Sequence, residues 1–365
     1  MPLPAPLPPD TAPASAIALN ADAAERLRRL RAEATAANTA RAQRSDTRYL
    51  TAWTERRLGL DLTDPAALPL PPEAVVTFVL DHVDLTGDGI SLPAAVDAAL
   101  VAAGVKRRPG PLGLATTERR LATLAALHRV CGVPSPTLHP GVRDLLRQAR
   151  RALAARGITP RAKRAATRDE VLGPMLDALP DDARGVRDRA LLAVAFASGG
   201  RRRSELVALR LADVTVAGRD FTLRIRRSKT DQQGAGADVP VKRAAADALR
   251  RWLRLLADQD ITDGPLFREL SRRGRVVRRR GAEGGAKPLD GRVVAEVVKR
   301  AARAAGLDPA AYAAHSLRSG FLTTGGRDGI PLDLLMQLSG HKSHRIAARY
   351  FQTGAVHQNP AADLL

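Results

Sequence analysis

The sequence has little cysteine, few aromatic residues and no long hydrophobic run. Its single cysteine, Cys131, excludes an internal disulfide bond and a thiolate metal site. No stretch approaches the roughly 18 apolar residues of a membrane-spanning helix. Aromatic residues make up 3% of the chain, and the 45% hydrophobic share consists mostly of alanine, leucine and valine. This composition favours packed helices over large sheets.

Acidic residues are also scarce relative to basic ones. The 365 residues include 58 Lys and Arg but only 38 Asp and Glu, which gives a net charge of +20 and a pI near 11.3. So large a surplus repels itself unless a polyanion neutralises it. Nucleic acid is therefore the first candidate partner and an anionic membrane surface the second. The N-terminus lacks the charged start of a secretory signal, so we expect a soluble, cytoplasmic and nucleoid-associated protein.

Motifs for metal or nucleotide chemistry are missing from the sequence. The seven histidines do not form an H-E-x-x-H or comparable metal-binding pattern. The phosphate-binding pattern G-x-x-x-x-G-K-[ST] is absent as well. We therefore expect no metal site and no cofactor, and an activity that does not depend on ATP.

The length of the chain favours two domains over a single core. Residues 1–21 are rich in proline and alanine and are expected to be disordered. Residues 22–157 have a helical pattern throughout, residues 158–168 form a basic linker, and residues 169–365 form the second domain. In the first domain, apolar periodicity and glycine stops predict helices at 45–59, 71–83, 91–104, 115–132 and 140–157.

The second domain combines helices with a short β region. A largely apolar helix is predicted at 185–200, and a shorter helix follows it. Alternating residues between 214 and 241, with a turn rich in Gly, Asp and Gln, predict a small antiparallel sheet. The predicted fold class is therefore mainly α, with a helical N-terminal domain and a mixed, mostly helical second domain that contains this sheet.

Four segments of the second domain combine cations or imidazoles with glycines or a tyrosine. They are "GGRRRSELVALR" (199–210), "RRSKTDQQG" (226–234), "AHSLRSG" (314–320) and "SGHKSHRIAARYF" (339–351). Together they supply Arg202, Lys229, His315, Arg318, His341 and Tyr350. Taken singly, each residue is better explained as surface charge or packing, so the case depends on the set and its order.

A tyrosine among cations is suited to phosphoryl transfer. Positioned arginine and lysine groups stabilise negative charge on the non-bridging oxygens of a phosphate. A phenol has a pKa of about 10 and is a weak nucleophile alone, and neighbouring cations favour its ionised form. These residues therefore indicate covalent catalysis on a phosphodiester, with side chains in place of a metal ion.

In their order and spacing, these residues resemble the tyrosine recombinase (phage integrase) family. That family has an arginine in G-x-R-x-x-E-L, a β-hairpin lysine, H-x-x-R, a Gly-His or Gly-Trp pair, and a nucleophilic tyrosine about nine residues later. Gly200, Arg202 and Glu205 match the first motif, and Ser319 stands where many members have a second histidine. The resemblance covers roughly residues 25–355 and implies that residues 44–157 form a helical, SAM-like core-binding domain.

The resemblance implies a site-specific recombinase that forms a 3′-phosphotyrosyl link with double-stranded DNA. The implied catalytic set is Arg202, Lys229, His315, Arg318, His341 and the nucleophile Tyr350, with Glu205 in support. The family also implies a tetramer on two recombination sites, monomers in free solution, and accessory directionality proteins as further partners.

Both domains are expected to grip one DNA duplex. The candidate DNA contacts are Arg48, Arg119, Arg120, Arg201 and Arg203. Two alternatives stay open: a type IB topoisomerase, which uses similar chemistry, and a non-catalytic DNA-binding protein, which is disfavoured because every active-site position is filled. Within the recombinases, integration or excision of a mobile element and resolution of DNA dimers also stay open.

Overall fold

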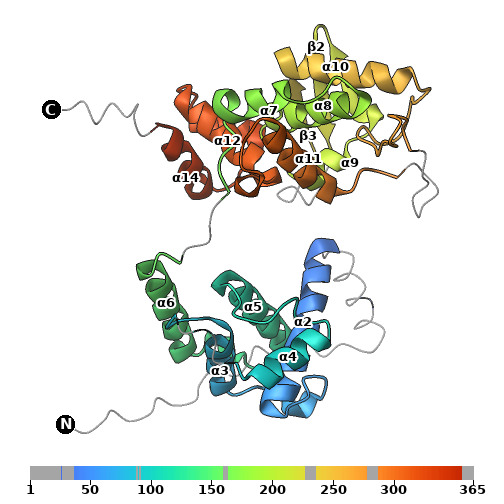
Figure 1. Cartoon of the computed structure of the whole chain (residues 1–365). Coiled ribbons are helices and arrows are strands. Elements are labelled where there is room, and N and C mark those ends of the chain that lie inside the picture. Colours follow the sequence, from blue (N-terminus) through green and yellow to red (C-terminus); the bar gives the residue numbers. More distant parts are fainter. Residues whose placement is uncertain are drawn as a thin grey trace, which may run out of the picture. The chain divides into compact units, whose positions relative to one another are not determined.

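The chain divides into two compact units, Met1–Arg161 and Ala162–Leu365, both drawn in Figure 1. The structure is a computed structural model that describes residues 26, 37–87, 89, 92–158, 163–226, 236–277 and 287–355. The predicted tail at 1–21 and residues 159–162 of the predicted linker lie outside the described residues. The predicted domain boundaries at 157 and 169 stay predictions.

The described part of the first unit is a bundle of helices joined by short loops. Its α-helices are α2 (Ala37–Leu58), α3 (Pro72–His82), α4 (Ala94–Ala102), α5 (Leu114–Val130) and α6 (Pro140–Ala155). Each predicted helix is found. Helix α2 begins earlier than predicted because its first turns contain good helix formers, such as alanine and arginine, without an apolar pattern.

Three of the chain's few aromatic residues lie together in the core of this first unit. Tyr49 and Trp53 on α2 pack against Phe78 on α3, and the Trp53 and Phe78 rings meet edge to face at 4.9 Å. Their polar atoms are bonded within the core. The Tyr49 hydroxyl lies 2.6 Å from His82 Nε2, and Trp53 Nε1 donates to Asp81 at 3.0 Å. These three aromatic residues therefore link α2 to α3.

The second unit is built around helix α8 (Ala183–Ala197), of which residues 190–195 are buried. The unit begins with a π-helical turn, Arg168–Leu172, and the short helix α7 (Gly173–Asp177). Helices α10 (Arg243–Ala257) and α11 (Gly291–Ala304) pack against α8. The short helix α9 (Arg203–Ala208) follows α8 and contacts α11.

The predicted antiparallel sheet is confirmed. Its strands are β1 (Val214–Ala217), β2 (Asp220–Ile225) and β3 (Ala237–Val241), in the order β1-β2-β3. Leu223 in the central strand pairs with Val214 on one side and Val239 on the other, and it is fully buried. Residues 227–235, which connect β2 to β3 and contain the predicted Lys229, lie outside the described residues.

The last helices of the second unit pack on one another. They are α12 (Ala314–Arg327), α13 (Leu332–Ser339) and α14 (His344–Ala355). Leu322, Leu335, Met336 and Ala347 form a small apolar cluster between them, against which Tyr350 packs. This cluster holds α14 against α12. Within the residues that the structure describes, no helix combines the length and apolar character needed to cross a membrane.

Candidate active site

Two glycines after α8 bring distant segments together. Gly199 and Gly200 have φ values of 94° and 69°, which favour glycine. A Cβ atom on Gly200 would lie 2.3 Å from the Arg318 Cα atom, and one on Gly199 would lie 2.4 Å from the Leu338 carbonyl oxygen. Only glycine allows this approach. The turn therefore sets the start of α9 directly against α12 and the end of α13.

Arg202 precedes α9 and is held by a buried carboxylate. Its Nη1 atom donates to Glu205 Oε1 at 2.7 Å, and its backbone N–H donates to Glu205 Oε2 at 3.3 Å. The Arg202 side chain keeps 26% of its surface exposed, whereas that of Glu205 keeps 3%. Glu205 thus orients the guanidinium group from within the fold while part of that group faces outward.

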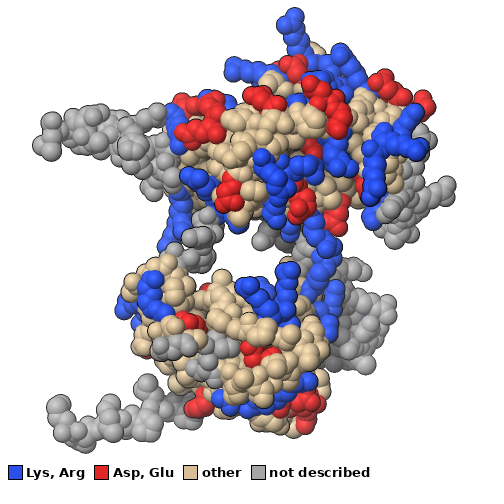
Figure 2. Space-filling model, viewed as in Figure 1, with Lys and Arg blue, Asp and Glu red and all other residues tan. Residues whose placement is uncertain are grey.

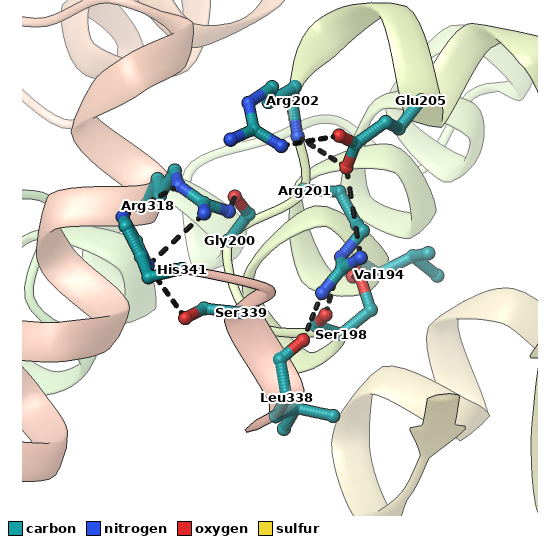
Figure 3. Close-up of polar contacts among 10 residues, drawn as sticks. All are labelled: Val194, Ser198, Gly200, Arg201, Arg202, Glu205, Arg318, Leu338, Ser339 and His341. Carbon is teal, nitrogen blue, oxygen red and sulfur yellow. Dashed lines mark hydrogen bonds and ion pairs between the residues drawn. The ribbon is translucent and has the colours of Figure 1, made fainter. Parts of the chain in front are cut away.

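Arg318 on α12 lies between the glycine turn and His341, as Figure 3 shows. Its Nη1 atom donates to the Gly200 carbonyl at 3.1 Å, and its Nε atom donates to His341 Nε2 at 3.2 Å. Ser339 Oγ lies 2.7 Å from His341 Nδ1. A neutral imidazole has one acceptor nitrogen. Arg318 Nη2 also lies 3.1 Å from His341 Nδ1. Arg318 therefore faces both ring nitrogens, and the tautomer of the ring decides which of them accepts its hydrogen bond.

Tyr350 extends from α14 toward the start of α12. Its hydroxyl lies 3.1 Å from His315 Nε2, and the two rings meet edge to face at 5.8 Å. Thr323 donates its hydroxyl proton to the Tyr350 backbone carbonyl at 3.3 Å, which ties α14 to α12 near this residue. The phenol and the imidazole are therefore within hydrogen-bonding distance in the same chain.

A pocket of about 360 Å³ adjoins these groups. It is lined by Arg201, Arg202, Arg203, Ser204, Ala295, Ala313, Ala314, His315 and Arg318. Three of the predicted catalytic residues therefore share one pocket, and His341 and Tyr350 contact members of that set. Lys229 cannot be compared because it lies outside the described residues.

Both imidazoles of the site and the Arg318 guanidinium group have lowered pKa values. Partial burial, followed by Arg318 and Arg202, lowers the pKa of His341 to about 4. Burial and then Arg202 lower the pKa of Arg318 to about 10. The pKa of His315 is also lowered, by desolvation and then by Arg318. At neutral pH both imidazoles are neutral and Arg318 is charged. An anion in the pocket would offset these shifts.

Two of the predicted DNA contacts are disfavoured by burial. Arg201 is 6% exposed, and its Nε atom donates to the Ser198 carbonyl at 2.7 Å. Arg120 is 8% exposed and lies over the Tyr49 ring, 3.3 Å from its centroid. Neither guanidinium group is open to a DNA backbone. A run of arginines in a sequence does not indicate which of them the fold encloses.

The remaining predicted contacts stay predictions. Arg48 and Arg203 are exposed, and Arg119 is half-exposed while it bonds Asp46. Figure 2 shows lysine and arginine side chains on the visible face of both units, with acidic side chains interspersed.

Two serines near the site have contacts that the sequence did not predict in detail. Ser319 is buried and its hydroxyl donates to the carbonyls of His315 and Ser316, so it bonds its own helix instead of facing the pocket. The contact of Ser339 with His341 was not predicted. Its only signal in the sequence is a polar residue directly before the Gly-His pair.

Comparisons with known proteins indicate the family to which the chain belongs. The model of the phage integrase family matches residues 166–356. An integrase/recombinase xerD homolog of Selenomonas ruminantium is 30% identical over 253 residues, which cover 67% of this chain and 70% of the relative. Tyrosine recombinase XerD of Xanthomonas axonopodis pv. citri is 32% identical over 238 residues, which cover 62% and 68% of the two chains.

The chain belongs to the phage integrase family, that is, to the tyrosine recombinases. Recombinase cre of Escherichia phage P1 is a further relative, 24% identical over 256 residues, which cover 67% of this chain and 74% of the relative. Among solved structures, the Tn1549 transposon integrase in complex with transposon right end DNA is similar, with a TM-score of 0.53 at 15% identity. The match covers 93% of this chain and 98% of the integrase. The predicted fold class and family are thereby confirmed.

Proposed function

We propose that this protein is a site-specific recombinase that cleaves and rejoins double-stranded DNA through a 3′-phosphotyrosyl intermediate. The observation that carries the proposal is the Tyr350 hydroxyl, 3.1 Å from His315 Nε2 and beside a pocket lined by arginines. Relatives named as recombinases, and a similar integrase solved with DNA, support DNA as the substrate.

In the first step, the Tyr350 oxygen forms a bond to the scissile phosphorus while the bond from phosphorus to the 5′-oxygen breaks. His315 is neutral at pH 7, so its Nε2 atom accepts the phenolic proton. Lys229 gives a proton to the leaving 5′-oxygen. The products are a 3′-phosphotyrosyl link and a free 5′-hydroxyl.

The cations of the site stabilise the charge that develops in this step. Arg202 and Arg318 hold the non-bridging oxygens, His341 assists them, and Glu205 orients Arg202. The energy of the broken bond is kept in the phosphotyrosine. A 5′-hydroxyl from a second strand therefore reseals the DNA without ATP, and the arginines take the place of a metal ion.

Exchange between two DNA sites requires more than one protomer. By analogy with the family, monomers in solution assemble as a tetramer on two sites, and accessory proteins set the direction of the reaction. The proposed role is integration or excision of a mobile element, or resolution of DNA dimers.

Covalent capture on DNA that flanks the protein's own gene tests the proposal. The wild-type chain is mixed with these fragments, and protein–DNA adducts are isolated under denaturing conditions and sequenced at their 3′ ends. We expect adducts at one or a few sites. Tyr350→Phe is the matched control, which retains DNA binding but forms no adduct. An adduct that survives this substitution contradicts the assignment of the nucleophile.

A type IB topoisomerase would use the same adduct differently. Relaxation of a supercoiled plasmid that lacks the mapped site would favour that alternative. DNA binding without any adduct would favour a non-catalytic binding protein.

A further inference from the structure

Arg201, the residue before Arg202, is buried in a network that Figure 3 draws. Its Nε atom donates to the Ser198 carbonyl at 2.7 Å, and its Nη2 atom donates to the Leu338 carbonyl. Its Nη1 atom lies 3.7 Å from Glu205 Oε2. One guanidinium group thus bonds the end of α8 and the end of α13, and it pairs with the first turn of α9.

The partners of Arg201 contact, or are adjacent in sequence to residues that contact, the proposed phosphate-binding groups. Glu205, which pairs with Arg201, also holds Arg202. Leu338 is followed by Ser339, whose hydroxyl contacts His341. Arg201 therefore connects the segment that presents Arg202 to the segment that presents His341, although 137 residues separate Arg201 from Leu338.

Stability alone gives no reason for a charge at this position. Burial lowers the pKa of Arg201, and the opposing effect of Glu205, which favours the charged form, does not cancel it. Buried ion pairs are often no more stabilising than apolar residues of similar volume. What an apolar side chain cannot do is bond two backbone carbonyls from distant segments and a carboxylate at once.

We propose that Arg201 is a positioning residue that sets the placement of His341 relative to Arg202. Arg201 does not touch the DNA. It fixes the Leu338 carbonyl and Glu205, and these hold the two groups that bind the phosphate. The role rests on the proposed strand-cleavage function, because the placement matters only when one phosphate contacts both groups.

The test compares Arg201→Met with Arg268→Met in the full chain. Arg268 is also buried in the second unit, where it donates to the carbonyls of Pro265, at 2.9 Å, and Asp263. Both substitutions remove two carbonyl bonds from a buried arginine. We expect Arg201→Met to slow single-turnover cleavage of a nicked duplex carrying the mapped site about 10- to 100-fold, since small misplacements of reacting groups have effects of this size. Arg268→Met should cleave like the wild type, and DNA affinity should be unchanged in both variants.

A second readout does not depend on cleavage. In NMR spectra of protein with labelled histidine, the His341 ring signals should shift in Arg201→Met and stay in place in Arg268→Met. Wild-type cleavage in Arg201→Met, or equal losses in both variants, would overturn the proposal. If the wild type itself forms no adduct, the proposed function fails, and unmoved His341 signals would then separately refute the role of Arg201. Arg201→Lys, which keeps the charge but not the guanidinium fork, gives the same comparison should the methionine variant not fold.

Discussion

Buried cations of the first unit and the arginines of the active site differ in the negative charge beside them. Outside the active site, the second unit resembles the first, since buried Arg187 bonds Asp188. Among the described residues of the first unit, buried Lys106 bonds Asp97. Buried Arg120 lies 3.6 Å from Asp46, which Arg119 also bonds. In the second unit, Arg201 and Arg202 share Glu205. Within the part of the chain that the structure describes, Arg318 bonds the Gly200 carbonyl oxygen and the His341 imidazole instead of a carboxylate.

This difference distinguishes cations that are compensated by a carboxylate within the fold from cations that are available to bind an anion. A buried cation beside a carboxylate is compensated within the fold, and removing it leaves a buried anion with less compensation. The arginines beside the pocket carry more positive charge than Glu205 offsets. Burial is the main cause of the lowered pKa values of His341 and Arg318, and the neighbouring arginines add to it. An incoming phosphate supplies the missing negative charge. Substitution of an arginine beside the pocket should therefore affect strand cleavage more than stability, and substitution of a compensated arginine should do the reverse.

The largest effect is expected on strand cleavage. Arg318→Met should lower the rate of covalent adduct formation about 100- to 1,000-fold, because the transition state loses a preorganised cation. Arg120→Met is the matched control, a buried arginine of the first unit, and it should leave the cleavage rate of bound protein unchanged. Quantification of adducts on the mapped site under single-turnover conditions measures both. Equal losses in the two variants would contradict the distinction.

The next effect is on the free energy of unfolding, and here the Arg120 substitution should have the larger effect. Arg120→Met should lower the free energy of unfolding by about 2–4 kcal/mol, because Asp46 is then buried with less compensation. Arg318→Met should change it little, since removing one of several like charges offsets the lost hydrogen bonds. Urea unfolding of both variants gives the comparison. Adding Asp46→Asn to Arg120→Met should restore part of the loss, and no restoration would show that the pair is not responsible.

The arginines of both units also show what the sequence can and cannot predict. Apolar periodicity predicted the helices and alternation predicted the sheet, because both patterns are local. Motif spacing selected Arg202 and Arg318 as candidates. The burial of Arg120 and Arg201 depends on tertiary contacts, such as the bond from Arg201 to a carbonyl 137 residues away. The sequence alone does not distinguish a buried arginine from an exposed one beside it, so Arg120 and Arg201 were both predicted as DNA contacts.

The pH dependence of stability provides a third test. Burial lowers the pKa of His82 from 6.5 to about 4. The unfolded chain therefore binds a proton that the folded chain excludes between these values. The stabilising effect of neutral His82 is present above pH 6.5 and is lost as pH falls toward 4. We expect a loss of about 2 kcal/mol over this window from this residue.

His82→Gln removes the titrating group and tests how much of the pH dependence of stability comes from His82. Guanidinium unfolding at a series of pH values should give a shallower acid-side decline for this variant than for the wild type. Direct NMR titration of the His82 ring in the wild type provides the control. Parallel stability curves for the two proteins would contradict the prediction.

The smallest expected effect distinguishes His82 from His341, the two histidines whose pKa values are lowered to about 4. Desolvation is the leading cause of the lowered pKa of both His82 and His341, and cations contribute to both. Lys106 and Arg120 act on His82 in the first unit, whereas the cations that act on His341, Arg318 and Arg202, line the pocket. Sulfate in the pocket would offset those cations, so it should raise the pKa of His341 by about one unit and leave that of His82 unchanged. Histidine NMR titrations with sulfate and with chloride at equal ionic strength measure the difference. Arg318→Met should weaken the response, because it removes part of the charge that sulfate neutralises. An unmoved His341 despite bound sulfate would mean that the arginines are already compensated within the fold, and the contrast between the buried cations of the first unit and the arginines of the active site would then fail.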